Sequence, residues 1–187
     1  MKNLNVCLVI PEYSGNLGDT IIRFGIKVLL KDFFKKNNII TNFYHFVFEN
    51  QPDCSDLKNK DFGLIVICGT PWIWDKCEVS KKYYNLTWFL NKHPKAVKVA
   101  LGIGSCFPLE CDYTLVTQNN YTMKFLENLY KNFSLIIVRD FYALKVFKKL
   151  RKCSQQTFKD FCPSVLAFEY VKNLIPNNLI NDKKKVV

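Results

Sequence analysis

No run of apolar residues in this chain reaches the roughly 18 residues that a membrane-spanning helix requires. The apolar stretch from Val6 to Ile10 is too short for a secretory signal, and it runs directly into Pro11 and Glu12. We therefore expect a cytoplasmic protein with no transmembrane segment.

The eight cysteines include no Cys-x-x-Cys pair, and without a secretory signal their spacing does not indicate a disulfide framework. No cysteine pair has the spacing of a zinc site, and the two histidines, His45 and His93, lie far from the cysteines of the C-terminal half. We expect no metal or other cofactor, so chelators should leave folding and ligand binding unchanged.

The 27 basic residues outnumber the 16 acidic ones and give a net charge of +11, but no nucleic-acid-binding motif is present. A solvated basic surface explains this charge better than a nucleic-acid groove. Binding to DNA or RNA should therefore be weak, independent of sequence and steeply reduced by salt.

Strand-like apolar runs alternate with segments of helical spacing along the 187 residues, of which 49% are hydrophobic. We expect strands at 4–10, 39–48, 62–68, 96–101 and 134–138, and helices at 20–36, 114–133 and 141–152. Repeated strand, helix, strand units imply one Rossmann-like α/β domain, residues 1–180, whose mostly parallel sheet carries helices on both faces.

The strand runs lack the alternation of half-exposed strands, so their central residues should be buried. The side chains chosen to test this are Cys7, Val66, Val99 and Ile136. Gly25 falls on the apolar side of the first helix, where it would permit close approach to a strand.

Four segments each follow the carboxyl end of an expected strand, which is where open α/β sheets bind ligands. They are Pro11–Asp19, Gly69–Asp75, Gly102–Pro108 and Arg139–Asp140. In the first, a glycine-containing loop starts a helix and leaves backbone N–H groups facing a crevice that suits an anion. Asp19 is placed to cap that helix, and the alternative is a turn and cap without a ligand.

The other candidate side chains also have two interpretations. Arg139 suits a carboxylate or phosphate, or it pairs with Asp19 or Asp140 for structure. Trp72 and Trp74 can stack on a sugar or pack against a neighbouring loop.

Further alternatives concern the remaining polar groups at these strand ends. Gly69 and Gly102 can be ordinary strand exits, and Asp140 can be a helix cap. His45 and His93 are weak candidates for a catalytic acid.

Five short motifs recur in order along the chain: Asn16-Leu17-Gly18-Asp19, Leu64-Ile65-Val66-Ile67-Cys68-Gly69, Leu101-Gly102-Ile103-Gly104, Ile137-Val138-Arg139-Asp140 and Cys162-Pro163-Ser164. Together they resemble the N-terminal half of the polysaccharide pyruvyl transferase family. The resemblance implies a GT-B-like architecture of two Rossmann-like domains. It also implies transfer of pyruvate, as a ketal, from phosphoenolpyruvate to a sugar of a surface polysaccharide.

The substrate-binding residues that we carry forward are Asn16, Gly18, Asp19, Gly69, Trp72, Asp75, Gly102, Gly104 and Arg139. The partners are then phosphoenolpyruvate and a saccharide acceptor, and no catalytic residue is assigned.

The chain departs from the family pattern at three places. The usual glycine-rich strand exit is replaced by Gly69–Asp75, Ala143 stands where a small hydroxyl residue is often seen, and the second domain is missing. Residues 181–187 look like the start of that domain, so we expect a complementing domain or chain to supply the principal donor-binding cations. An exposed patch at Trp72, Trp74 and Phe107 should then face it.

Two other classes of function remain open beside pyruvyl transfer. One is a non-catalytic sugar- or nucleotide-binding module of the same fold, and the other is a basic nucleic-acid or assembly protein. The fold alone does not choose among them.

Overall fold

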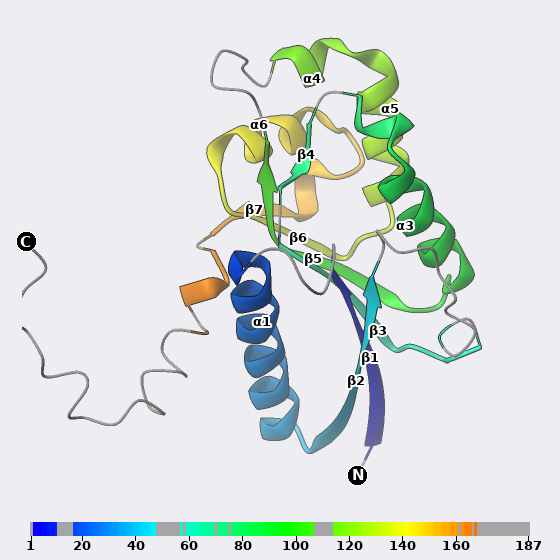
Figure 1. Ribbon diagram of the computed structural model, residues 1–187, viewed down its shortest axis with the longest axis vertical. Helices are drawn as coiled ribbons and strands as arrows, with labels where there is room; N and C mark the ends of the chain where they lie inside the picture. The colour runs from blue at the N-terminus through cyan, green and yellow to red at the C-terminus, as the bar shows by residue number, and fades with distance from the viewer. Residues whose placement is uncertain are drawn as a thin grey trace, which may run out of the picture.

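The computed structural model describes residues 2–10, 17–47, 57, 59–69, 71–74, 76–106, 114–160, 162–165 and 167. The strands are β1 (Lys2–Ile10), β2 (Ile39–Val47), β3 (Leu64–Cys68), β4 (Pro71–Ile73), β5 (Val97–Ser105), β6 (Leu135–Val138) and β7 (Thr157–Lys159). The helices are α1 (Leu17–Lys36), α3 (Lys81–Lys92), α4 (Thr114–Gln118), α5 (Asn120–Tyr130) and α6 (Phe141–Lys149). Figure 1 shows their arrangement.

The seven strands form an open sheet in the order β2-β1-β3-β5-β6-β7, with β4 paired to β5 beyond the end of β3. Every pairing among the described strands is parallel. The sheet therefore confirms the expected mostly parallel α/β architecture. The strand order reverses at β1 and β3, and in such sheets the carboxyl ends at the reversal border a ligand crevice.

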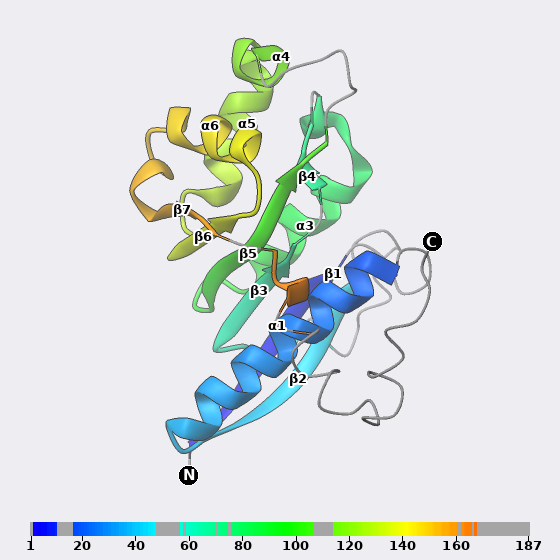
Figure 2. The same cartoon turned by 90° about the vertical axis from the view of Figure 1, so that its left-hand side faces the viewer.

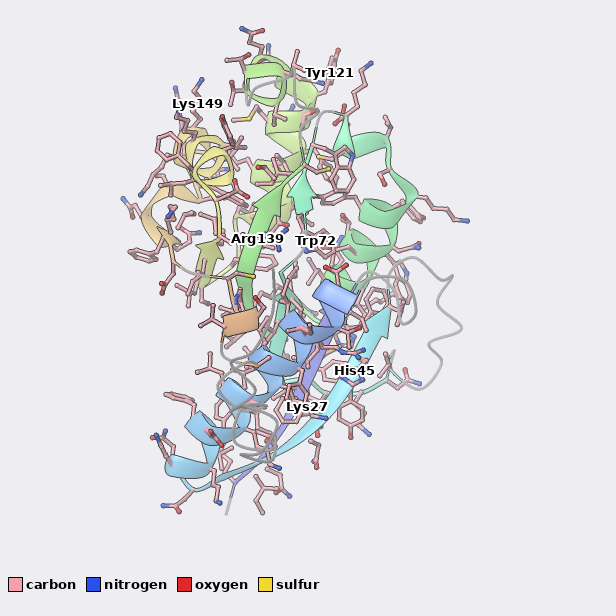
Figure 3. All side chains as sticks on the ribbon, turned by 60° about the vertical axis from the view of Figure 1, so that its left-hand side comes forward. Lys27, His45, Trp72, Tyr121, Arg139 and Lys149 are labelled. Carbon is pink, nitrogen blue, oxygen red and sulfur yellow. The ribbon has the colours of Figure 1, made fainter. Side chains whose placement is uncertain are left out.

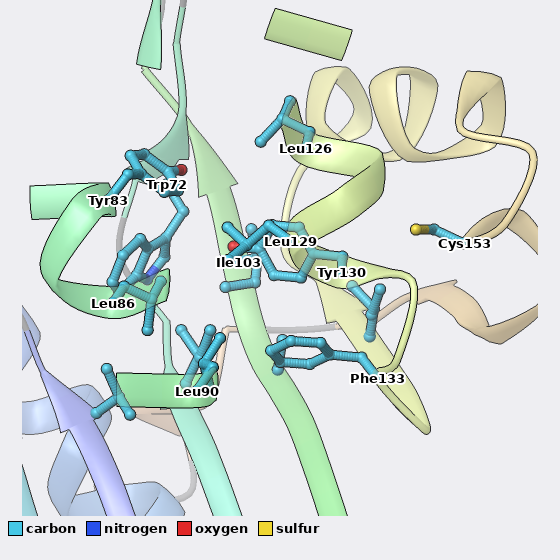
Figure 4. Close-up of a cluster of buried hydrophobic side chains, with 14 of the residues drawn as sticks. Trp72, Tyr83, Leu86, Leu90, Ile103, Leu126, Leu129, Tyr130, Phe133 and Cys153 are labelled. Atoms are coloured by element: carbon cyan, nitrogen blue, oxygen red, sulfur yellow. The ribbon is translucent and has the colours of Figure 1, made fainter. Parts of the chain in front are cut away.

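Helices cover the two faces of the sheet unequally. On one face, Ile22 and Ile26 of α1 pack on Val6 and Leu8 of β1. The other face is covered by α3, α5 and α6, which share the larger core (Figure 2). Figure 4 shows that core, where Trp72, Tyr83 and Tyr130 lie among aliphatic side chains.

Three of the four residues chosen as tests of burial are fully buried, namely Cys7, Val66 and Ile136. Val99 is only half-buried. It lies on the α1 face of β5, whereas α1 packs chiefly on β1, β2 and β3. The prediction was therefore wrong for Val99, because β5 lies beyond the part of the sheet that α1 covers.

Several element boundaries differ from those expected. The glycine segment from Gly102 to Ser105 continues β5 instead of leaving it, because β4 supplies a hydrogen-bonding neighbour there. The long helix expected at 114–133 is divided into α4 and α5. The division falls at Asn119, whose side-chain oxygen caps α5 by accepting from the backbone N–H groups of Tyr121 and Thr122.

The first helix also starts earlier than predicted. α1 begins at Leu17, so Asp19 lies in its first turn and is not the cap. A carboxylate in the first turn still suits the positive end of the helix dipole. Gly25 does permit a close approach, but to the Pro163 carbonyl instead of a strand: a Cβ atom on Gly25 would lie 2.3 Å from that oxygen.

Candidate anion-binding site

Asp140 holds together the ends of β5 and β6 and the start of α6. One carboxylate oxygen accepts the Ser105 backbone N–H at 2.7 Å, and the other accepts the Ser105 hydroxyl at 2.8 Å and the Ala143 N–H at 2.8 Å. The helix-cap interpretation of Asp140 is therefore correct, and its extra bonds to Ser105 fix the position of the preceding residue, Arg139.

The guanidinium of Arg139 lies close to Gly104 on the neighbouring strand. A Cβ atom built on Gly104 would lie 2.4 Å from Nε of Arg139 and 3.0 Å from Cζ, so only glycine leaves room for this guanidinium. The main chains are joined as well, since the Arg139 N–H donates to the Ile103 carbonyl at 2.9 Å. The second glycine of the Gly-x-Gly motif therefore leaves the space that the Arg139 guanidinium occupies.

Cys162 and Ser164 complete this cluster from a later segment of the chain. The Ser164 hydroxyl donates to Sγ of Cys162 at 3.2 Å. Burial acts to raise the pKa of the Cys162 thiol, but hydrogen bonds from Ser164 and from Arg139, together with the Arg139 charge, lower it below its ordinary value. The site therefore combines a guanidinium with an acidified, partly accessible thiol.

Two buried glycines bring this segment close to the sheet. A Cβ atom on Gly69 would lie 2.3 Å from the carbonyl oxygen of Gly102, and one on Gly102 would lie 2.4 Å from Cδ of Pro163. Gly102 also has a φ of +78°, which disfavours other residues. These glycines permit close packing of backbone segments, in agreement with the strand-exit interpretation.

A second guanidinium, overlooked in the sequence, lies near the end of β3. Arg23 of α1 is half-buried, and its charge acts on both Cys68 and His45. Burial, followed by the charges of Arg23 and Lys27, lowers the pKa of His45. Figure 3 shows Lys27 and His45 together at α1 and β2, apart from Arg139.

The structure brings together three of the nine predicted binding residues: Gly102, Gly104 and Arg139. Gly69 adjoins them as a backbone contact. Gly18 is exposed and Asp19 half-buried in the first turn of α1. Asn16 and Asp75 lie outside the described residues, as does Phe107 of the predicted patch.

The prediction of an exposed Trp72 is wrong. Its side chain is 0% exposed, its indole N–H donates to the Cys68 carbonyl at 3.2 Å, and its ring contacts Tyr83. Trp74 is half-buried and lies 5.1 Å from the same tyrosine ring. Both tryptophans therefore join the core under α3, and Trp72 offers no face for a sugar.

The two histidines lie apart from Arg139. His93 precedes β5 and so lies at the amino edge of the sheet, opposite to the strand ends that carry Arg139. It cannot serve as the acid of a site at the carboxyl edge.

Over the described residues there is no group of three or more side chains suited to holding a metal ion. In the same part of the chain, no helix is both long and apolar enough to cross a membrane.

We expect the arginine to control the reactivity of the Cys162 thiol. Alkylation requires the thiolate, so the pH midpoint of Cys162 alkylation should lie below that of an unperturbed cysteine and should rise in Arg139→Ala. Peptide mapping by mass spectrometry after timed iodoacetamide labelling measures this midpoint, with the exposed Cys106 as an internal control. An identical Cys162 midpoint in both proteins would contradict the arrangement.

Comparison with known proteins identifies no relative: no family model, no curated protein and no solved structure matches the chain.

Proposed function

We propose that this chain is a polysaccharide pyruvyl transferase-like protein whose carboxyl sheet edge binds the anionic donor phosphoenolpyruvate. The proposal includes a GT-B-like arrangement, in which a second Rossmann-like domain or a complementing chain faces this edge. The pyruvyl group would be transferred as a ketal to a sugar of a surface polysaccharide.

The observation that carries the proposal is the close contact between the Arg139 guanidinium and Gly104. Three of the motifs that support the family resemblance meet there: Gly102 and Gly104 of β5, Arg139 after β6, and Cys162 with Ser164. A merely structural set of motifs need not converge on one cation. The convergence lies at the carboxyl ends of β5 and β6, on the edge of the sheet that binds ligands in such proteins, two strands along from the reversal at β1 and β3.

Arg139 has the chemistry that this role requires. A guanidinium presents five N–H donors in a planar fork that matches a carboxylate or phosphate, so donation to Cys162 leaves further donors for a ligand. The guanidinium lies against Gly104, and the Asp140 bonds to Ser105 and Ala143 hold the adjacent backbone in place, so Arg139 is partly positioned before a ligand binds. Arg23 adds positive potential near the end of β3.

The remaining chemistry needs an acid that protonates the phosphoenolpyruvate methylene and groups that bind the phosphate as it leaves. We assign no acid among the described residues. The proposal places the principal donor-binding cations on the second domain, so this chain alone should bind the donor weakly, through Arg139, and transfer little or no pyruvate.

Isothermal titration calorimetry of this chain with phosphoenolpyruvate tests the donor site. Arg139→Ala should weaken binding at least about ten-fold, because it removes charge-assisted hydrogen bonds. Arg139→Lys should weaken it less, and the exposed Arg151→Ala is the matched control that should not change it. No binding, or equal binding by Arg139→Ala, would exclude the site.

Pyruvyl transfer itself requires a second experiment. The chain supplied with a second domain should transfer pyruvate from phosphoenolpyruvate to a galactose- or mannosamine-type acceptor, and both Arg139→Ala and Asp19→Ala should reduce the rate. If a folded, complemented protein binds the donor or a sugar but transfers nothing, the non-catalytic binding module becomes the better interpretation.

The substitution Gly104→Ala separates the effect of the Arg139–Gly104 contact on donor affinity from any effect on the stability of the fold. The added methyl group would meet only the mobile end of Arg139, at 2.4 to 3.0 Å, so the guanidinium should move away while the sheet stays intact. We expect a loss of donor affinity close to that of Arg139→Ala, with a stability change of about 1 kcal/mol or less. Calorimetry measures the donor affinity, and urea unfolding of the same sample measures the stability. An unchanged donor affinity would show that the Arg139–Gly104 contact does not position the arginine for binding.

A further inference from the structure

A lysine-lined hollow of about 290 Å³ opens at the opposite edge of the sheet from Arg139. Lys60 approaches it from the segment before β3, and Lys92 and Lys95 come from the end of α3 and the turn before β5. Asp61 and His93 also line it. Its position at the amino ends of the strands makes it a separate feature from the proposed donor site.

The charges around this hollow are strongly unequal. Three lysines and one aspartate line it, and over the described residues no ion pair joins Lys92 or Lys95 to an acidic side chain. Lys60 contacts the Tyr44 ring, with Nζ 4.4 Å from its centroid. The hollow thus keeps a net positive charge that the described part of the protein does not neutralise.

A fourth lysine, Lys98, adds positive charge near the hollow. Lys98 is buried, and its ammonium donates to the carbonyl oxygens of His93 at 2.9 Å and Ala96 at 3.2 Å. These carbonyls anchor it to the turn before β5, so it is not placed to reach a ligand in the hollow. Its charge still adds to the positive potential there.

His93 is the buried polar group of this hollow. It is 7% exposed and packs against the rings of Phe62 and Phe89, with centroids 5.0 and 4.8 Å away. Its Nε2 atom is buried without a hydrogen-bond partner in the described structure. Burial and the Lys98 charge lower the pKa of His93, although Asp61 acts in the opposite direction.

We propose that the hollow binds a small oxyanion, a phosphate or carboxylate group, between Lys60, Lys92 and Lys95, and that His93 takes up a proton when the anion binds. The negative charge of the anion would offset the charge of Lys98, which now disfavours the imidazolium of His93. By linkage, protonation of His93 would favour the anion in return. The volume lies just below the range for ligand pockets, roughly 300–1,000 Å³, which suits a small ligand.

Proton NMR of the imidazole signals tests this directly, because the chain contains only two histidines. Signals are assigned with His45→Gln and followed during titration with inorganic phosphate at constant ionic strength. The His93 signal should shift saturably, and its titration midpoint should rise when phosphate is bound. Acetate in a parallel titration shows whether a carboxylate suffices.

The Lys92→Gln/Lys95→Gln double variant should weaken the phosphate response of His93 about ten-fold or more, because two charged donors are lost. The matched control is Lys31→Gln/Lys35→Gln, which removes two exposed lysines of α1. An unchanged His93 response in the first variant, or a His93 response without saturation, would overturn the proposal.

The lysine-lined hollow and the proposed donor site at Arg139 can be tested separately. Arg139→Ala should leave the phosphate response of His93 unchanged, and the Lys92→Gln/Lys95→Gln variant should keep the donor binding that depends on Arg139. If Arg139→Ala alone abolished the His93 response, the oxyanion would be bound at the carboxyl edge and the lysine-lined hollow would have no ligand.

Discussion

Replacing Gly69 with alanine is expected to lower the free energy of unfolding by roughly 3 kcal/mol, at the upper end of the cost of overpacking. The added methyl group would lie 2.3 Å from the Gly102 carbonyl oxygen and 2.8 Å from that of Leu101. Both oxygens belong to the backbone of β5, in the middle of the sheet, so neither can rotate away. Urea unfolding followed by circular dichroism measures the loss.

Gly63→Ala is the matched control for this substitution. A methyl group on Gly63 would also come within 2.3 Å of another atom, but that atom is Cδ1 of Leu4, the far end of a flexible side chain. Leu4 can adopt another rotamer at small cost. If Gly69→Ala proved as mild as Gly63→Ala, the proposed close contact between β5 and the end of β3 would be wrong.

Asp140→Ala is expected to cost about 3 kcal/mol, because it removes a helix cap and two charge-assisted hydrogen bonds at once. The carboxylate joins Ser105 of β5 to Ala143 of α6. Thermal unfolding should therefore show a clear fall in the melting temperature. Arg139, whose backbone adjoins these bonds, should also be less well positioned.

Ser105→Ala supplies the comparison for Asp140. It removes only the hydroxyl bond to Asp140 and keeps the backbone bond, so we expect about 1 kcal/mol. The double substitution should cost little more than Asp140→Ala alone, since both remove the same contact. Strictly additive losses would show that Asp140 and Ser105 stabilise the protein independently.

The central strands could be predicted from sequence because their apolar runs are continuous. β1 and β3 are covered on both faces, and that requires residues such as Val6, Ile65 and Val66 at successive positions. Helix α3 was left unassigned, although its buried residues Tyr83 and Leu86 are three positions apart. Its lysines and asparagines obscure a pattern that only the packing on Trp72 makes clear.

The candidate site was predictable in part. Arg139 could be located at a strand end, since local sequence defines both the apolar run before it and the polar break after it. Its contact with Gly104 depends on the pairing of β5 and β6, and its contact with Cys162 depends on a segment that returns from 23 residues later. Such contacts arise from tertiary structure, which residue spacing does not specify.

The parallel pairing of every described strand has a consequence for how the chain folds. Lys2 pairs with Ile39 and Val6 with Leu64, so even the first pairs of the sheet close loops of dozens of residues. No hairpin is available among these strands to start the sheet cheaply. Chain-closure entropy is therefore lost before the strands gain their hydrogen bonds, which makes folding slow relative to that of helical bundles and lengthens the exposure of apolar strands to aggregation.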